Sequence, residues 1–208
     1  AEKLGINQST AVTCVKPSGT VSQLVNAASG IHARHNPHYV RTVRGDNKDP
    51  LTMFLKDKGI PSEPDFTAPD NVTVFSFPMK SPEGAICRYD MSALAQLELW
   101  LKIADNYCEH KPSVTISVKE NEWLEVGAWC WEHFDSLSGI SFLPFSDHSY
   151  KQAPYQDIDK EAFKELTEKM PPAIDWYELQ DYEKEDTTTG SQELACAGGV
   201  CEIVDIGA

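Results

Sequence analysis

Residues 16–22 have the composition of a phosphate-binding loop. They follow a short apolar run at 12–15 and precede a segment of helical character. Backbone N–H groups at the start of a helix are free to donate, and the positive end of the helix dipole lies there. Glycine lets an anion approach the backbone, hydroxyl groups add donors, and lysine adds a positive charge. The candidate phosphate-binding residues are Lys16, Pro17, Ser18, Gly19, Thr20, Val21 and Ser22.

The same seven residues also fit a simpler interpretation. Small and hydroxylated residues often cap the start of a helix without binding any ligand. Residues 16–22 could therefore form only a capped turn between a strand and a helix. The order of a Walker A loop, G-x-x-x-x-G-K-[ST], is absent. The residue types alone leave both interpretations open.

Two cysteines near the end of the chain could carry redox chemistry. Cys196 and Cys201 enclose a segment that contains Gly198 and Gly199, so the chain can fold back and a small disulfide ring is sterically feasible. Exposed, flexible thiols exchange with other disulfides through a mixed disulfide. A metal site is disfavoured, because only two cysteines are present, without C-x-x-C spacing and without a nearby histidine. The alternative is that both thiols are exposed at the surface and have no redox role.

Three histidines, His32, His35 and His38, are spaced by three residues. A shared metal ion would need their rings on one face of a regular element. Gly30 and Pro37 interrupt a helix across this stretch, so we expect no metal site there. Arginines in the same segment could help to hold an anion or pair with the acidic surface.

The hydrophobic pattern predicts the elements that must position these residues. Strands are expected at 12–15, 38–44, 72–78, 113–119 and 139–143. Helices are expected at 21–28, 50–58, 92–109, 121–134, 159–170 and 175–182. This alternation is typical of α/β architecture with crossover connections. From residue 183 onward the chain is acidic and rich in threonine and glycine, so we expect a flexible tail.

The composition excludes several classes of function. The 208 residues include 41% hydrophobic and 24% charged residues, which is typical of globular proteins. A formal net charge of −14 argues against nucleic acid and against an anionic membrane surface as partners. The sequence has no apolar run of membrane-spanning length and no signal peptide, so we expect a cytoplasmic protein. Because an initiator methionine is missing, we expect the first residue to be a cut within a longer protein.

Several short motifs, spread over nearly the whole chain, occur together in one known family. The K-P-S-G-T-V-S loop is followed by S-G-I-H at 29–32 and by Y-V-R-T-V-R at 39–44. The further motifs are Q-L-E-L-W at 96–100, S-V-T-I-S-V-K at 113–119, G-I-S-F-L-P at 139–144 and A-P-Y at 153–155. Together they resemble the C-terminal third of the large chain of ribonucleotide reductases. The ending from Glu193 to Cys201 is similar to that of the adenosylcobalamin-dependent (class II) members, especially the ribonucleoside-triphosphate reductases.

The resemblance implies a fold, an activity and partners. Residues 1–182 would form the C-terminal part of a ten-stranded α/β barrel, and residues 183–208 a flexible redox-shuttle tail. The intact enzyme would reduce ribonucleoside triphosphates to 2′-deoxyribonucleoside triphosphates by radical chemistry, with adenosylcobalamin as cofactor. Residues 16–22 would bind the substrate phosphates. Cys196 and Cys201 would reduce the disulfide left by turnover, and thioredoxin or a similar donor would then reduce them.

One departure from the family pattern matters. The radical cysteine of this family, its neighbouring Asn and Glu, and the two active-site cysteines lie upstream of the phosphate loop, and no signature for them is present here. We therefore expect an incomplete fragment that is inactive without the rest of the reductase chain. The alternatives are a stand-alone phosphate- or nucleotide-binding module without catalysis, and an interaction domain whose loop is only a capped turn. The loop could cradle a diphosphate as well as a triphosphate.

Overall fold

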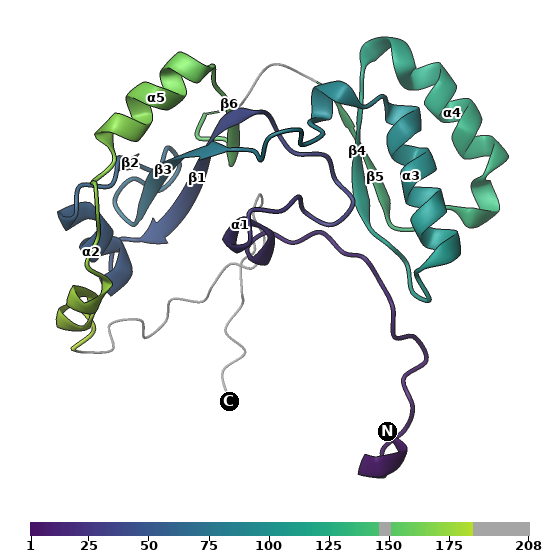
Figure 1. Cartoon of the computed structure of the whole chain (residues 1–208), viewed down its shortest axis with the longest axis horizontal. Coiled ribbons are helices and arrows are strands. Elements are labelled where there is room, and N and C mark those ends of the chain that lie inside the picture. The colour runs from purple at the N-terminus through teal and green to yellow at the C-terminus, as the bar shows by residue number, and fades with distance from the viewer. Residues whose placement is uncertain (146–150, 185–208) are drawn as a thin grey trace. The chain divides into compact units, whose positions relative to one another are not determined.

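A computed structural model describes residues 1–145 and 151–184 of the chain (Figure 1). They form a mixed α/β fold with two compact units. The first unit comprises Ala1–Thr42 and Phe77–Thr167, and the second comprises Val43–Ser76 with the described part of Glu168–Ala208. Within the described residues no helix is long and apolar enough to cross a membrane.

The larger sheet has four strands in the order β2-β3-β1-β6. Their bounds are Ser62–Pro64 for β2, Val72–Lys80 for β3, His38–Asp46 for β1 and Tyr155–Asp157 for β6. Strand β2 pairs antiparallel with β3, and β6 pairs antiparallel with β1. The predicted strands at 38–44 and 72–78 are confirmed as β1 and β3, and both extend two residues further.

The smaller sheet is a parallel pair of strands covered by two helices on one face. Its strands are β4 (Val114–Val118) and β5 (Ile140–Pro144). Helices α3 (Ala93–Asn106) and α4 (Trp123–Glu132) pack against it (Figure 1). The core beneath them holds Leu97, Trp100, Ile116, Val118, Val126 and Trp129. Since β4, α4 and β5 follow each other in the chain, they form the crossover unit that parallel strands require.

The ends of α3 and α4 show which sequence signals are reliable. Ser92 Oγ accepts a hydrogen bond from Ala95 N at 3.1 Å, which confirms the predicted helix start. The helix ends at Asn106 rather than at residue 109, because the N–H groups of Glu109 and its neighbour His110 donate to Thr13 O instead. Helix α4 begins at Trp123 rather than at residue 121, since a 3₁₀ turn at Glu120–Glu122 precedes it.

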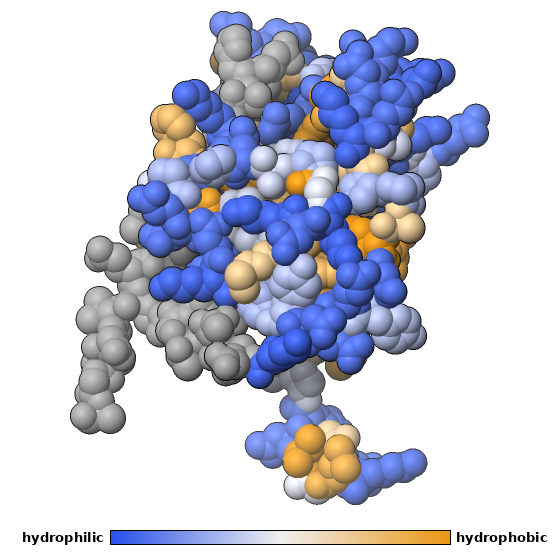
Figure 2. All heavy atoms as spheres, turned by 90° about the vertical axis from the view of Figure 1, so that its left-hand side faces the viewer, coloured by the Kyte–Doolittle hydropathy of each residue, from blue (hydrophilic) through white to orange (hydrophobic). Residues whose placement is uncertain are grey.

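Helices α2 (Pro50–Asp57) and α5 (Lys160–Lys169) confirm two further predictions. The side chain of Asp49 accepts from Leu51 N at 2.9 Å, and that of Asp159 accepts from Ala162 N at 2.7 Å. The segment predicted as a last helix is a 3₁₀ helix, Trp176–Asp181. Hydrophilic residues cover most of the surface seen in Figure 2, in keeping with 32 acidic against 18 basic residues.

Two predictions next to the candidate loop need correction. Residues 12–15 do not form a strand but an extended segment without a ladder partner. The helix predicted at 21–28 is only one turn long, α1 (Val21–Leu24), because Asn26 adopts a left-handed backbone conformation with φ of 49°. The described strands belong to a four-stranded and a two-stranded sheet, and no closed barrel is present among them.

Candidate functional site

The candidate phosphate loop is closed by two serines. Ser18 Oγ accepts from Ser22 N at 3.1 Å, and Ser22 Oγ donates to Ser18 O at 2.6 Å. Ser18 N in turn donates to Ser29 Oγ at 2.7 Å. These contacts use the hydroxyl group and the N–H group of Ser22 inside the loop. The N-cap position of α1 is Thr20, whose side chain makes no capping hydrogen bond. The hydroxyl of Ser22 is a structural donor within the loop.

Between these serines lies a run of backbone N–H groups. Gly19, Thr20 and Val21 are exposed, and their N–H groups donate no hydrogen bond to any residue in the described part of the chain. Consecutive N–H groups of this kind form a concave donor set for an anion. The loop thus offers the donors that a phosphate would need.

Gly30, a glycine outside the loop, allows a close approach to the backbone of the loop at Lys16. Gly30 adopts φ of 59°, and a Cβ atom there would lie 2.8 Å from Lys16 O. Because that distance is too short for a carbon and a carbonyl oxygen, only glycine allows this close approach. The S-G-I-H motif, singled out only as part of a resemblance, therefore supports the loop through Ser29 and Gly30. Sequence reasoning missed both as site residues.

Lys16 supplies the charge of the loop. Its Nζ donates to Ser113 Oγ at 2.8 Å. In the described ranges, 1–145 and 151–184, Lys16 forms no ion pair, so no carboxylate there neutralises its charge. A neutral partner orients the ammonium group and leaves its charge available to an anion.

An aromatic cluster contacts the helix that follows the loop. Gln23 Nε2, on α1, donates to the hydroxyl of Tyr155 at 3.3 Å. The guanidinium of Arg41 lies 4.5 Å from the centroid of the Tyr155 ring, and the ring of His35 lies 5.1 Å from it. Tyr155 belongs to the A-P-Y motif, and no sequence pattern indicates that it contacts α1.

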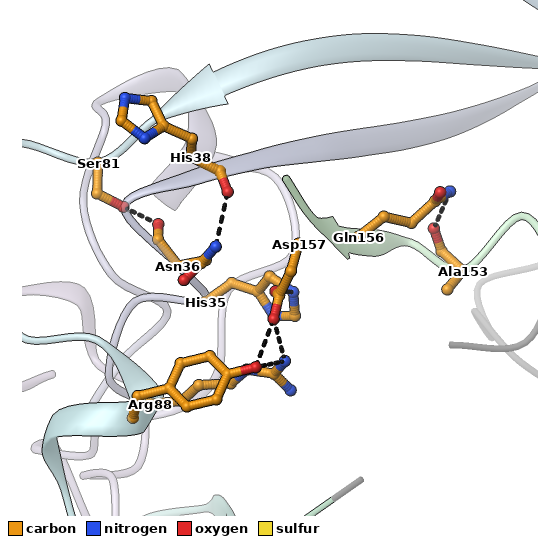
Figure 3. A network of polar contacts seen from close by, with 9 residues as sticks. His35, Asn36, His38, Ser81, Arg88, Ala153, Gln156 and Asp157 are labelled. Atoms are coloured by element: carbon orange, nitrogen blue, oxygen red, sulfur yellow. Dashed lines mark hydrogen bonds and ion pairs between the residues drawn. The ribbon is translucent and has the colours of Figure 1, made fainter. Parts of the chain in front are cut away.

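The polar network of Figure 3 holds this cluster in place. Asp157 Oδ1 lies 2.7 Å from His35 Nε2, and Oδ2 accepts from Arg88 Nη2 at 2.7 Å and from Tyr89 OH at 2.6 Å. Burial lowers the pKa of His35 to about 4, and the charge of Arg88 acts in the same direction, so the ring is neutral at pH 7. Burial opposes ionisation of Asp157, but hydrogen bonds from Tyr89 and Arg88 lower its pKa.

The three evenly spaced histidines have three different environments. His32 Nε2 accepts from Thr115 N at 2.9 Å, and Nδ1 lies 2.7 Å from Ser29 O, so His32 is the neutral tautomer protonated at Nδ1. His35 contacts Asp157, and His38 lies against the ring of Phe163. Among the described residues, no group of three or more His, Cys, Asp and Glu side chains could hold a metal ion.

The cysteines divide into two sets. Cys196 and Cys201, the predicted shuttle pair, lie outside the described residues. The four described cysteines, Cys14, Cys87, Cys108 and Cys130, are free thiols. Burial raises the pKa of Cys87 and of Cys130 above the ordinary value, so neither is an activated thiolate.

Comparisons with known proteins identify the chain's relatives. No family model matches it. It is 33% identical over 172 residues to the adenosylcobalamin-dependent ribonucleoside-triphosphate reductase of Euglena gracilis, covering 82% of this chain and 24% of the relative. It is 30% identical over 210 residues to a probable reductase of the same name from Dictyostelium discoideum. This match covers 98% of the present chain and 27% of the relative. It is 28% identical to the reductase of Lactobacillus delbrueckii subsp. bulgaricus, in a match that covers 98% of this chain and 28% of the relative.

A solved structure agrees with these relatives. The crystal structure of a B12-dependent (class II) ribonucleotide reductase matches with a TM-score of 0.72 and 26% identity, covering 89% of this chain and 26% of that chain. The chain spans about a quarter of the length of the proteins it matches. The chain belongs to the family of adenosylcobalamin-dependent ribonucleotide reductases.

Proposed function

We propose that the chain is the C-terminal part of a class II ribonucleotide reductase and contributes the loop that binds the substrate phosphates. The observation that carries this proposal is the run of exposed N–H groups at Gly19, Thr20 and Val21, beside a lysine that has no described carboxylate partner. This donor set lies in a chain whose net charge of −14 would otherwise repel an anion. The similarity to named reductases, over 98% of the chain in several of them, supports the same role.

In the intact enzyme the reaction would be reduction of a ribonucleoside triphosphate to the 2′-deoxyribonucleoside triphosphate. Adenosylcobalamin, when bound, would supply the radical. The described cavity of the first unit is lined mainly by alanine, isoleucine, leucine and methionine. Such a lining does not fit a cofactor whose ring carries many amide groups, so we assign no cofactor contact to the residues that line this cavity. Their part is to bind and orient the phosphates, while residues upstream would carry the radical.

The β4–α4–β5 unit would belong to the ten-stranded α/β barrel of the intact enzyme. Parallel strands covered by helices on one face are the building unit of such barrels. Residues 1–182 would form the C-terminal portion of the barrel, and residues 183–208 the redox-shuttle tail. We expect this portion alone to be inactive, because it lacks the cysteine that would abstract the substrate hydrogen.

The shuttle would be Cys196 and Cys201. Their two thiols would reduce the disulfide formed at the active site and become a disulfide themselves, and a thioredoxin-like dithiol would regenerate them by the same exchange. Replacing both with serine in the intact enzyme should stop turnover driven by thioredoxin. Prereduced enzyme should still complete about one turnover, because the active-site thiols are already reduced. Continued turnover with thioredoxin would disprove the shuttle.

The phosphate role is tested by Gly19→Val. No atom lies within 4 Å of a Cβ built at Gly19, so the fold can accommodate the larger side chain. We expect this bulk to hinder an anion that approaches the neighbouring N–H groups. In the intact enzyme we expect KM for the nucleoside triphosphate to rise about tenfold or more, the scale of a lost charge-assisted hydrogen bond, with kcat changed much less. Gly127→Ala in α4 also places its Cβ in open space and is the matched control. An unchanged KM for Gly19→Val would contradict the proposal.

Calorimetry with a nucleoside triphosphate separates this proposal from the stand-alone module. If the 208 residues bind the nucleotide without the rest of the reductase, the module is favoured. If binding needs the intact chain, the reductase fragment is favoured.

A further inference from the structure

A cavity in the first unit is not used by the proposed function. It has a volume of about 340 Å³ and lies between the segment that follows α1, the segment before residue 88, and α3. Its apolar lining includes Ala27, Ala28, Ile31, Ile86, Met91 and Leu99. The other lining residues include Asn26, His32 and Arg34. A cavity of this size can enclose part of a small organic group.

The charged residue of the lining is a buried arginine. Arg34 is only 6% exposed, yet its described partners are neutral. Nη2 donates to Asn26 Oδ1 at 2.6 Å, and Nε donates to Ser81 Oγ at 3.3 Å. Asn26 reaches Arg34 from a left-handed backbone conformation, with φ of 49°. Among the described residues, no carboxylate pairs with Arg34.

A buried guanidinium without an anion is unfavourable. Moving an ion away from water costs several kcal/mol, and neutral hydrogen bonds offset only part of that cost. A guanidinium has five N–H donors. The two described acceptors, Ser81 Oγ and Asn26 Oδ1, therefore leave further donors of Arg34 without a described side-chain acceptor. His32 cannot accept a hydrogen bond from Arg34, because both of its ring nitrogens already contact other groups, Ser29 O and Thr115 N. Arg34 is therefore the one charged residue among those that line this cavity, and most of the other lining residues are apolar.

We propose that this cavity binds a carboxylate carried on an apolar body, with Arg34 as its counter-ion. The planar guanidinium matches a carboxylate in geometry and in charge, and the apolar walls would receive the body of the ligand. A group with two negative charges fits less well, since the lining supplies one positive charge. The carboxylate could come from a free small molecule or from an acidic side chain, with apolar neighbours, elsewhere in the intact reductase. The proposal does not depend on the phosphate loop.

Alanine methyl groups offer direct reporters for the test. Ala27, Ala28, Ala33 and Ala85 line the cavity, whereas Ala162 lies on α5 outside it. The 208-residue chain, labelled at its alanine methyl groups, is titrated with phenylbutyrate and with its neutral amide while nuclear magnetic resonance spectra are recorded. We expect the cavity methyls to shift and that of Ala162 to stay. Affinity for the carboxylate should exceed that for the amide about tenfold or more, the scale of a charge-assisted hydrogen bond.

The variant Arg34→Met keeps an apolar stem and removes the charge, so it should abolish the preference for the carboxylate. Arg41→Met is the matched control and should keep it, because Arg41 does not line the cavity. Equal affinity for carboxylate and amide, no shift of the cavity methyls, or an unchanged preference in Arg34→Met would each overturn the proposal. The comparison of the two ligands on the unmodified chain remains decisive if Arg34→Met does not fold.

The same titration in the intact reductase identifies the source of the carboxylate. If phenylbutyrate still binds, the natural ligand is a free small carboxylate. If it binds to the 208-residue chain but not to the intact enzyme, an acidic side chain of the remaining reductase already occupies the cavity. The phosphate proposal is tested separately by the KM of Gly19→Val. Failure of the cavity proposal therefore does not contradict the phosphate proposal, and the reverse also holds.

Discussion

Lys16 and Ser113 lie 97 residues apart in the sequence and are joined by a hydrogen bond of 2.8 Å from Nζ to Oγ. Ser113 immediately precedes β4, whose alternate residues Val114, Ile116 and Val118 are buried in the core beneath α3 and α4. The ammonium group of Lys16 is thus anchored next to the hydrophobic core of the first unit. Its position is determined by the core while its charge is left without a carboxylate partner in the described residues.

The first prediction separates the charge of Lys16 from its anchor. In the intact enzyme, Lys16→Ala should raise KM for the nucleoside triphosphate about tenfold, because a charge-assisted contact to phosphate is lost. Ser113→Ala should change KM less than about threefold, since a neutral hydrogen bond is worth less. Steady-state kinetics of both variants provides the measurement. Equal effects of the two substitutions would show that Lys16 acts through its anchor and not through phosphate.

The second prediction concerns the close approach at Gly30. Gly30→Ala introduces a Cβ 2.8 Å from Lys16 O and keeps a positive φ, so the free energy of unfolding should fall by about 1–3 kcal/mol. Gly127→Ala lies within α4 with no atom within 4 Å of its Cβ, and it should raise stability by about 0.5–1 kcal/mol. Urea unfolding of both variants tests this. A neutral effect of Gly30→Ala would mean that the loop backbone can move away from the turn.

The third prediction is a loss of stability in mild acid that originates from His35. Its pKa is about 4 in the folded chain against an ordinary 6.5, so the unfolded chain binds this proton more readily. The free energy of unfolding should therefore fall as the pH decreases from about 6.5 to about 4. Asp157 faces the ring with a lowered pKa and Tyr39 with a raised one, so neither titrates in this interval.

The measurement for His35 is urea unfolding across that pH interval. His35→Gln should flatten the dependence, whereas His110→Gln, at an exposed position, should leave it in place. A slope that persists in His35→Gln would assign the acid sensitivity to other groups.

The fourth prediction concerns a buried carboxylate in the second unit. Asp65 accepts hydrogen bonds from Thr67 N, Thr67 Oγ1 and Ala68 N and pairs with Arg44 Nε at 2.8 Å. Hydrogen bonds from Thr67 lead the causes that lower its pKa from 3.8 to about 2. The stability that its charge provides is present above 3.8 and is lost as the pH falls to about 2.

Asp65→Asn should therefore lower the free energy of unfolding at pH 7 by about 1–3 kcal/mol, the scale of a buried group that loses its partner. It should also weaken the acid dependence between pH 3.8 and 2. Asp70→Asn is the matched control, because Asp70 is exposed. If both variants unfold alike, the hydrogen bonds to Asp65 contribute no stability.

The sequence predicted those elements whose signals are local. Helix α3 has an apolar face of regular spacing and a capping serine at Ser92, and β4 alternates buried and half-buried residues, so both are confirmed. The run at 12–15 has the composition of a strand, but its partners are single groups at residues 107–113 instead of a neighbouring strand. Helix α1 is short because Asn26 leaves helical geometry to reach Arg34, a tertiary contact that overrides propensity.

The site was predictable in composition but not in geometry. Glycine and hydroxyl residues in the loop fitted both an anion site and a simple capped turn, and the phosphate role of residues 16–22 remains a proposal. The close packing of Gly30 on Lys16 O and the hydrogen bond from Gln23 to Tyr155 depend on the tertiary structure. So does the burial of Arg34 without a carboxylate partner among the described residues. No local sequence pattern predicts such contacts. The roles proposed for Cys196 and Cys201 remain predictions.

The extended segment before the loop has a consequence for the order of folding. Thr13 and Glu109 are linked through hydrogen bonds that span 96 residues, and Lys16 contacts Ser113 across 97. Contacts between such distant residues form late, because the intervening chain must first be ordered. On the ribosome, residues 12–16 would emerge long before their partners at 107–113. Residues 12–16, which lead into the candidate phosphate loop, should therefore become structured only after β4 has been synthesised and packed.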